Sequence, residues 1–216
     1  MHYRTFLFDL DGTLTDPAEG ICQSVIYALQ STGRKTGPIE KYHKYIGPPL
    51  IRSFEVYENA SPEEAIELLR FYRERFSKVG LFENIPYPGM VELLRDLKAA
   101  GAKVAVATGK PTVYATQILE HFGMLPYVDF VSGIPLGNED REKCECIQHA
   151  LYTLHETDRD ACVMIGDRSH DAVGAKMAHI DFIGVLYGYG SREELEAEGD
   201  YALAESVDAL RALLFA

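Results

Sequence analysis

The segment FLFDLDGTLTD, residues 6 to 16, joins a short apolar run to two aspartates that stand two positions apart. In an extended chain, side chains two residues apart point to the same side, so Asp9 and Asp11 can converge on one point beyond a strand. Gly12 permits the sharp change of backbone direction that a loop needs there. Neighbouring carboxylates repel each other, so the pair suits a metal ion or a division of labour in proton transfer. A solvated turn also favours Asp and Gly, and the other strand ends must decide between these interpretations.

Apolar stretches of strand length recur along the chain and alternate with segments of helical periodicity. The strand-like stretches are residues 5–10, 102–109, 127–133, 161–167 and 182–188. They are nearly continuous apolar runs, which is typical of strands buried on both faces of a sheet. This alternation predicts βαβ units, and therefore an α/β fold with a Rossmann-like parallel sheet and helices on both faces. Right-handed crossovers then bring the carboxyl ends of the strands to one edge.

The interval from Pro17 to about Tyr87 breaks this alternation, because it contains helical signals and no convincing strand. Its longest amphipathic run starts at Ser61, and Glu64 three residues later completes a capping-box pattern. We therefore predict a helical cap domain over residues 17–87, inserted into an α/β catalytic core domain. The core domain is predicted to comprise residues 1–16 and 88–216.

The C-terminal part predicts elements that we expect to serve as scaffold. Ser191 and Glu194 form a second capping-box pattern, and residues 200–204 predict a short strand. A last helix is predicted from Ser206. The apolar residues expected to face the core from this helix are Val207, Leu210, Leu213 and Leu214.

Composition indicates a globular protein and argues against some partners. The chain has 216 residues, of which 47% are hydrophobic and 25% charged, and its formal net charge is −12. Nucleic-acid binders need clustered positive charge, so we expect no nucleic-acid partner. The start of the chain suggests neither a signal peptide nor a membrane span, and the cysteines lack a CxxC spacing. We expect a cytoplasmic monomer or homodimer with free thiols and no membrane partner.

Further polar residues fall at the predicted carboxyl edge of the sheet. Two predicted strands end in VATGK and in IGD, and a helix that returns to the same edge begins near a lysine. Open α/β sheets bind their ligands at this edge, and such convergence separates a site from an ordinary turn. The residues concerned are Thr108, Gly109, Lys110, Lys143, Asp167 and Asp171.

With these motifs the chain resembles the haloacid dehalogenase-like superfamily of phosphotransferases. The matching motifs are Asp9-Leu10-Asp11-Gly12-Thr13, Thr108, Lys143, and Gly166-Asp167 with Asp171. The helical insert resembles the cap of the first subclass, as in phosphoglycolate phosphatases and beta-phosphoglucomutase. The segments IGPPL, FENIPYPG, GDRSHD and GVLYGYGS are similar to a bacterial branch labelled 5'-nucleotidase or phosphoglycolate phosphatase.

The resemblance implies a role for each matched residue. Asp9 would be the nucleophile that forms an aspartyl-phosphate, and Asp11 would protonate the leaving oxygen and later deprotonate water. Mg²⁺ would bind the Asp9 carboxylate, the Asp11 backbone carbonyl and Asp167, which is an oxygen set suited to a hard cation. Asp171 would hold a metal-bound water. The remaining matched residues would surround the phosphoryl group: Thr108 and Lys143 by holding its oxygens, Gly12 and Thr13 as the loop.

Several nearby residues keep open alternatives. Lys110 competes with Lys143 for the phosphate, and Arg52 either reads an anionic substrate or is a surface charge. We expect His170 to be a bystander. We expect Asp16 to cap or close the linker into the insert rather than to bind the metal. Arg168 is expected to be a bystander, like His170. Tyr187 and Tyr189 either line the pocket or pack against the cap.

The expected function is that of a Mg²⁺-dependent phosphomonoester hydrolase. Its expected substrates are small phosphorylated metabolites of the nucleoside 5'-monophosphate or phosphoglycolate type. A phosphosugar mutase of the beta-phosphoglucomutase type would share every core residue. A non-enzymatic phospho-receiver domain would also use an acidic pair, a Thr and a Lys, but lacks a helical insert after its first strand. A dehalogenase is disfavoured, because that chemistry has no use for Asp11 or for metal.

Overall fold

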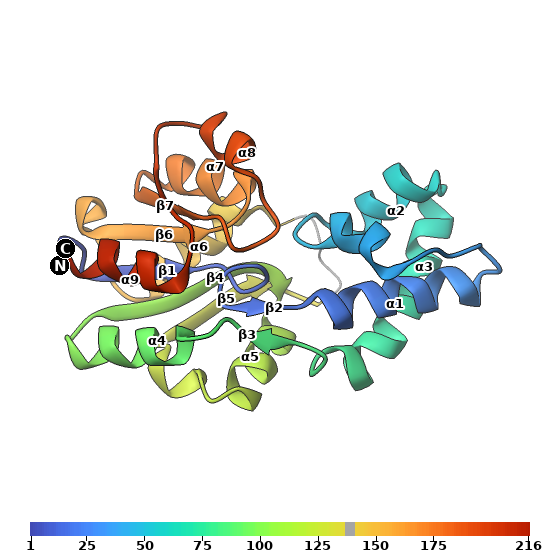
Figure 1. Cartoon of the computed structure of the whole chain (residues 1–216), viewed down its shortest axis with the longest axis horizontal. Coiled ribbons are helices and arrows are strands. Elements are labelled where there is room, and N and C mark those ends of the chain that lie inside the picture. The colour runs from blue at the N-terminus through green and yellow to red at the C-terminus, as the bar shows by residue number, and fades with distance from the viewer. Residues whose placement is uncertain (137–140) are drawn as a thin grey trace. The chain divides into compact units, whose positions relative to one another are not determined.

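The computed structural model describes residues 1–136 and 141–216, and its main element is a parallel sheet flanked by helices (Figure 1). Within these residues the sheet has six strands in the order β5-β4-β1-β6-β7-β8, and neighbouring strands run parallel. The prediction of an α/β fold with a parallel sheet is confirmed. The strands are β1 (Thr5–Phe8), β4 (Lys103–Pro111), β5 (Phe130–Ile134), β6 (Cys162–Gly166), β7 (Asp181–Val185) and β8 (Ala202–Ala204).

Strand β1 lies in the middle of the sheet, between β4 and β6. Thr5 pairs with Lys103 on one side and with Cys162 on the other. Residues 6–8 have no exposed surface, as expected for a strand that is covered on both faces. Because the three strands run in the same direction, their carboxyl ends meet at one edge of the sheet.

Helices cover both faces of this sheet. Helices α6 and α7 pack on one face, where Leu7, Ile147 and Met164 belong to one buried apolar cluster. Helices α4 and α5 pack against β4 and β5 on the other face (Figure 1). The helices of this unit are α4 (Met90–Ala99), α5 (Thr112–His121), α6 (Lys143–Thr153), α7 (Ser169–Ala178), α8 (Arg192–Glu196) and α9 (Val207–Phe215).

Two local expectations differ from the structure. The strand predicted from residue 127 begins only at Phe130, because the residues Leu125–Tyr127 form a 3₁₀ turn. Helix α9 buries Val207, Leu210 and Leu214, but Leu213 is 39% exposed, so the expected apolar stripe was one residue too wide. The short C-terminal strand is confirmed as β8.

The residues Pro17–Ile85 form a second compact unit, distinct from the unit Met1–Asp16 with Pro86–Ala216. It contains α1 (Ala18–Ser31), a 3₁₀ helix (Ile39–Tyr45), α2 (Leu50–Glu58), α3 (Pro62–Arg75) and a π-helical turn (Phe76–Gly80). The capping box of α3 is confirmed: the Glu64 N–H donates to Ser61 Oγ, and the Ser61 N–H donates to the Glu64 carboxylate.

The prediction of no strand between residues 17 and 87 is wrong at its end. Ile85–Pro86 forms the short strand β3, which pairs with β2 (Thr15–Asp16) in a two-stranded sheet. Two-residue strands are too short to show the alternation or the apolar run that predicts longer ones.

Two further expectations concern membrane-spanning helices and thiols. No helix in the described part of the chain is long and apolar enough to cross a membrane. All four cysteines are buried, and none forms a disulfide within the described residues, as expected from their spacing. They are Cys22, Cys144, Cys146 and Cys162.

Candidate active site

Asp9 follows β1 directly and begins a tight loop. Its N–H donates to the carbonyl of Ile165 at 2.9 Å, which continues the pairing of β1 with β6, and its side chain is buried. The backbone then turns at Gly12, whose φ of +83° lies in the region that favours glycine. A Cβ on Gly12 would also lie 2.3 Å from Asp167 Oδ2. Glycine is therefore required at position 12 for two reasons, which are the positive φ of the turn and the close approach of the Asp167 carboxylate.

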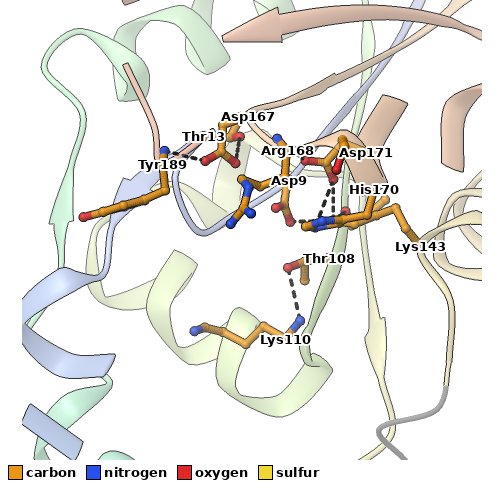
Figure 2. Close-up of polar contacts among 12 residues, drawn as sticks. Asp9, Thr13, Thr108, Lys110, Lys143, Asp167, Arg168, His170, Asp171 and Tyr189 are labelled. Atoms are coloured by element: carbon orange, nitrogen blue, oxygen red, sulfur yellow. Dashed lines mark hydrogen bonds and ion pairs between the residues drawn. The ribbon is translucent and has the colours of Figure 1, made fainter. Parts of the chain in front are cut away.

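Lys143 connects two of the acids. It is the first residue of α6, and its Nζ lies 2.8 Å from Oδ1 of Asp9 and 2.8 Å from Oδ1 of Asp171 (Figure 2). Nζ also donates to the carbonyl of Ala107 at 3.1 Å. Burial opposes the charge of these groups, but their mutual attraction outweighs it, so the pKa of Lys143 is raised and the pKa of Asp9 is lowered. Asp9 is therefore ionised.

Asp11 has a different environment from Asp9. Its Oδ2 lies 2.6 Å from Nζ of Lys110, but burial outweighs this attraction and raises the pKa of Asp11. Oδ1 of Asp11 is buried and has no hydrogen-bond partner within the residues that the structure describes. Thr108 is buried beside this pair, and its Oγ1 accepts a hydrogen bond from the Lys110 N–H at 3.2 Å (Figure 2). Two carboxylates two residues apart thus have pKa values shifted in opposite directions.

Asp167 follows β6 and is almost fully buried. Its Oδ2 accepts a hydrogen bond from the Tyr189 N–H at 2.7 Å, and its Oδ1 accepts a longer one from Thr13 Oγ1 at 3.5 Å (Figure 2). Burial, followed by the charges of Asp171 and Asp9, raises the pKa of Asp167 to about 8. A bound cation would relieve this repulsion.

His170 lies among the acids, beside two residues of the matched motifs. One ligand atom each of Asp9, His170 and Asp171 lie within 4.8 Å of one another. The Nε2 atom is 4.0 Å from Asp171 Oδ1, and the side chain is 37% exposed. Burial lowers the pKa of His170, so the ring is neutral at pH 7. From the sequence, His170 is known only to lie between two motif acids, and that position does not determine where the ring points.

Acids outnumber cations at this edge of the sheet, and the donors fit a divalent cation. Four carboxylates face two ammonium groups, and the neighbouring Arg168 is paired with Glu194. Carboxylate oxygens suit a hard cation such as Mg²⁺. Lys143 already lies between Asp9 and Asp171, so the cation would use other oxygens of the cluster. The carboxylates are those of Asp9, Asp11, Asp167 and Asp171, and the ammonium groups are those of Lys110 and Lys143.

The remaining predicted site residues divide between the two compact units. Gly109 lies on β4 beside Thr108, and a Cβ there would meet nothing within 4 Å, so its backbone faces open space. Arg52 is an exposed residue of α2 in the unit Pro17–Ile85 and takes part in none of the site contacts described above. The sequence left open whether Lys110 or Lys143 contacts the phosphate. In the structure the Lys110 ammonium pairs with Asp11 and the Lys143 ammonium pairs with Asp9.

Contacts from the segment after β7 were missed by the sequence interpretation. The Tyr187 hydroxyl donates to the Thr13 carbonyl at 3.2 Å, and the Tyr189 hydroxyl donates to Asp16. Glu194, expected to be scaffold, accepts hydrogen bonds from the Ser169 N–H and from Arg168. The two glycines that flank a tyrosine in GYG were the available signal, because they indicate a close backbone approach.

Comparisons with known proteins agree on one family. A family model described as haloacid dehalogenase-like hydrolase matches residues 6–185. A crystal structure of a predicted phosphatase from Clostridium acetobutylicum superposes with a TM-score of 0.94 at 41% identity, covering 100% of this chain and 99% of that one.

The curated relatives carry different names. A Pseudomonas aeruginosa protein named 5'-nucleotidase is 39% identical over 99% of this chain and 96% of its own length. A Mycobacterium tuberculosis protein named tyrosine-protein kinase PtkA is 36% identical over 96% of this chain and 71% of its own length. A Psychrobacter arcticus protein named phosphoglycolate phosphatase is 28% identical over 90% of this chain and 88% of its own length.

Proposed function

The chain belongs to the haloacid dehalogenase-like hydrolases, and from that premise we propose that it is a Mg²⁺-dependent phosphomonoester hydrolase with Asp9 as its nucleophile. Its proposed substrates are small phosphorylated metabolites of the nucleoside 5'-monophosphate or phosphoglycolate type, because two relatives carry the corresponding names. The observation that carries the proposal is the buried Asp9 carboxylate, which Lys143 holds in its ionised form at the end of β1.

In the first step, an oxygen of the Asp9 carboxylate attacks the phosphorus atom, and the bond from phosphorus to the leaving oxygen breaks. Asp11 gives its proton to that leaving oxygen, and burial, which raises the pKa of Asp11, supports its role as the proton donor. The buried ammonium of Lys143 and the Thr108 hydroxyl hold the phosphoryl oxygens, where positioning and charge neutralisation supply most of the acceleration. The product of this step is an aspartyl-phosphate on Asp9.

In the second step, a water molecule attacks the phosphorus of the aspartyl-phosphate. Asp11, now a carboxylate, accepts a proton from this water, and the bond from phosphorus to Asp9 breaks. Inorganic phosphate leaves, and Asp9 returns to its ionised form beside Lys143. The opposite pKa shifts of Asp9 and Asp11 support this division between nucleophile and acid–base.

The carboxylates of Asp9 and Asp167, with the backbone carbonyl of Asp11, would hold Mg²⁺, and Asp171 would support it through water. The ion would supply neutralisation of the negative charge on the transferring phosphoryl group. The excess of buried carboxylates over ammonium groups supports this assignment.

A phosphate-release screen tests the proposed function directly. The purified chain is incubated with nucleoside 5'-monophosphates, phosphoglycolate and sugar phosphates, with Mg²⁺ and with a chelator. We expect phosphate release from at least one class, loss of release in the chelator, and recovery when Mg²⁺ is restored. Isomerised sugar phosphate without phosphate release would instead identify a mutase. Stable phosphorylation without turnover would identify a receiver.

A second candidate function is phosphoryl transfer to a tyrosine hydroxyl, favoured by the 36% identity to the protein named tyrosine-protein kinase PtkA. The chemistry up to the aspartyl-phosphate would be the same, and only the acceptor would differ. Incubation with labelled ATP and a tyrosine-containing peptide separates the two functions. Label in peptide rather than in free phosphate would favour the kinase.

A further inference from the structure

The segment from Gly188 to Glu194 follows β7 and runs into α8. It lies against the acids and contains none of the residues to which the resemblance gives a catalytic or metal-binding role. We propose that this segment is a positioning element, which fixes Asp167 and the start of α7, and that Glu194 is its principal positioning residue. The inference rests on the proposed function in one respect, which is that Asp167 would be a residue that holds the cation.

The backbone of this segment lies in close contact with Asp167. The Tyr189 N–H donates to Asp167 Oδ2 at 2.7 Å. A Cβ on Gly188 would lie 2.5 Å from Asp167 Cβ, and a Cβ on Gly190 would lie 1.8 Å from the Asp167 carbonyl oxygen. Only glycine at both positions allows the Tyr189 N–H to approach the Asp167 carboxylate this closely.

Glu194, a residue of α8, fixes the other end of the same segment. Its Oε1 accepts hydrogen bonds from the Ser169 N–H at 2.8 Å and from Arg168 Nε at 3.0 Å. Ser169 is the first residue of α7, and N–H groups in the first turn of a helix have no partner within the helix. Glu194 therefore supplies the hydrogen-bond acceptor that the first residue of α7 lacks.

The α7 start is also fixed from the side of the acids. Asp171 Oδ2 accepts a hydrogen bond from the Arg168 N–H at 3.1 Å, while its Oδ1 lies 2.8 Å from Lys143 Nζ. A Cβ on Gly166 would lie 2.4 Å from Asp171 Cγ, so this side chain packs tightly against the backbone before Asp167. The residues between Gly166 and Asp171 are thus held by two carboxylates. Asp171 bonds the Arg168 N–H, and Glu194 bonds the Ser169 N–H and the Arg168 side chain.

This arrangement matters because the acids repel one another and need rigid support. Residues that support the ligands of a metal typically change its affinity by about 10–100-fold when they are removed. The hydrogen bonds of Glu194 go to Arg168 and to the Ser169 N–H rather than to the acids, so we expect it to act through the orientation of Asp167 and Asp171. A merely structural Glu194 would change the stability of the fold but not the Mg²⁺ affinity of the folded protein.

The test compares Glu194→Ala and Glu194→Gln with Glu193→Ala, which changes an exposed neighbour on the same helix. Mg²⁺ affinity is measured by calorimetric titration of the full chain, and amide hydrogen exchange is followed across residues 166–172. We expect Glu194→Ala to weaken Mg²⁺ binding about tenfold or more and to speed exchange of the Ser169 amide. Glu194→Gln keeps an acceptor but loses the charge facing Arg168, so it should show part of both effects. Glu193→Ala should match the wild type.

Wild-type Mg²⁺ affinity together with wild-type exchange in Glu194→Ala would overturn the inference. If that variant does not fold, the same pair of results in Glu194→Gln would overturn it. Failure of the wild type to bind Mg²⁺ would count against the proposed function. The exchange measurement needs no metal and would still decide whether Glu194 holds the start of α7.

Discussion

Asp9 and Asp11 have opposite electrostatic environments although they are two residues apart. Asp9 shares the Lys143 ammonium with Asp171. Asp11 forms an ion pair with Lys110, but burial has the larger effect on its pKa and raises it. Both lysines are themselves almost fully buried, so each ion pair lies in a region from which water is largely excluded. The two lysines therefore have different expected roles, and their replacement should have different consequences.

Replacement of Lys143 by alanine should be the more damaging of the two lysine changes. It leaves Asp9 and Asp171 buried without their shared cation, and breaking a buried pair in this way costs about 3–5 kcal/mol. We expect the free energy of unfolding to fall by that amount in a denaturant titration and turnover to be lost in the folded fraction. Lys110→Ala removes the partner of a single acid and is the matched control. Equal stability of Lys143→Ala and the wild type would contradict the bridging role.

The contact of Glu194 with the site could not be predicted at the scale of single residues. Asp9 and Asp167 were recognised because each directly follows an apolar strand, and that position is visible in the sequence. Glu194 meets Ser169, which lies 25 residues earlier, through a contact that only the fold creates. The direction of the His170 ring depends on the geometry of the first turn of α7, which no spacing rule specifies.

At the scale of elements, strand β1 is the part of the sheet on which the site depends most. It lies between β4 and β6, and Leu7 is fully buried in the apolar cluster that α6 and α7 share. We expect Leu7→Ala to lower the free energy of unfolding by about 2–5 kcal/mol, because the change leaves a cavity in a packed core. Leu213→Ala on α9, where the side chain is 39% exposed, should change it by less than about 1 kcal/mol. A denaturant titration of both variants measures the difference, and similar losses would argue against this view of the core.

Long elements were more predictable than short ones. The strands of the main sheet were predicted because strands covered on both faces are continuous apolar runs. Strands β2 and β3 have two residues each and carry no such pattern. The late start of β5 and the exposure of Leu213 reflect local turns and helix rotation, which shift a boundary or a stripe by a residue or more.

At the scale of the whole molecule, the chain consists of two compact units. The four site aspartates all belong to the unit Met1–Asp16 with Pro86–Ala216. We expect the unit Pro17–Ile85 to act as the cap that selects the substrate. The cytoplasmic location, the lack of a nucleic-acid partner and the monomeric or dimeric state stay predictions from the sequence.

Arg52 offers a test of this division of roles. If it reads an anionic part of the substrate, Arg52→Ala should raise KM about tenfold or more with little change in kcat, since a charged hydrogen bond contributes about 1.5–3 kcal/mol. Steady-state kinetics on the best substrate from the phosphate-release screen measures both constants. Arg73→Ala, another arginine of the same unit, is the control. An unchanged KM in Arg52→Ala would show that Arg52 is a surface charge without a role in substrate binding.

The central claim is that Asp9 carries phosphorus covalently during turnover. Its most direct measurement is acid quenching of the protein during turnover, followed by mass spectrometry of the peptide that contains Asp9. We predict a phosphoryl adduct on Asp9, and we predict that folded Asp9→Asn shows neither the adduct nor more than about a thousandth of the wild-type phosphate release. Phosphate release by Asp9→Asn at the wild-type rate would contradict the claim.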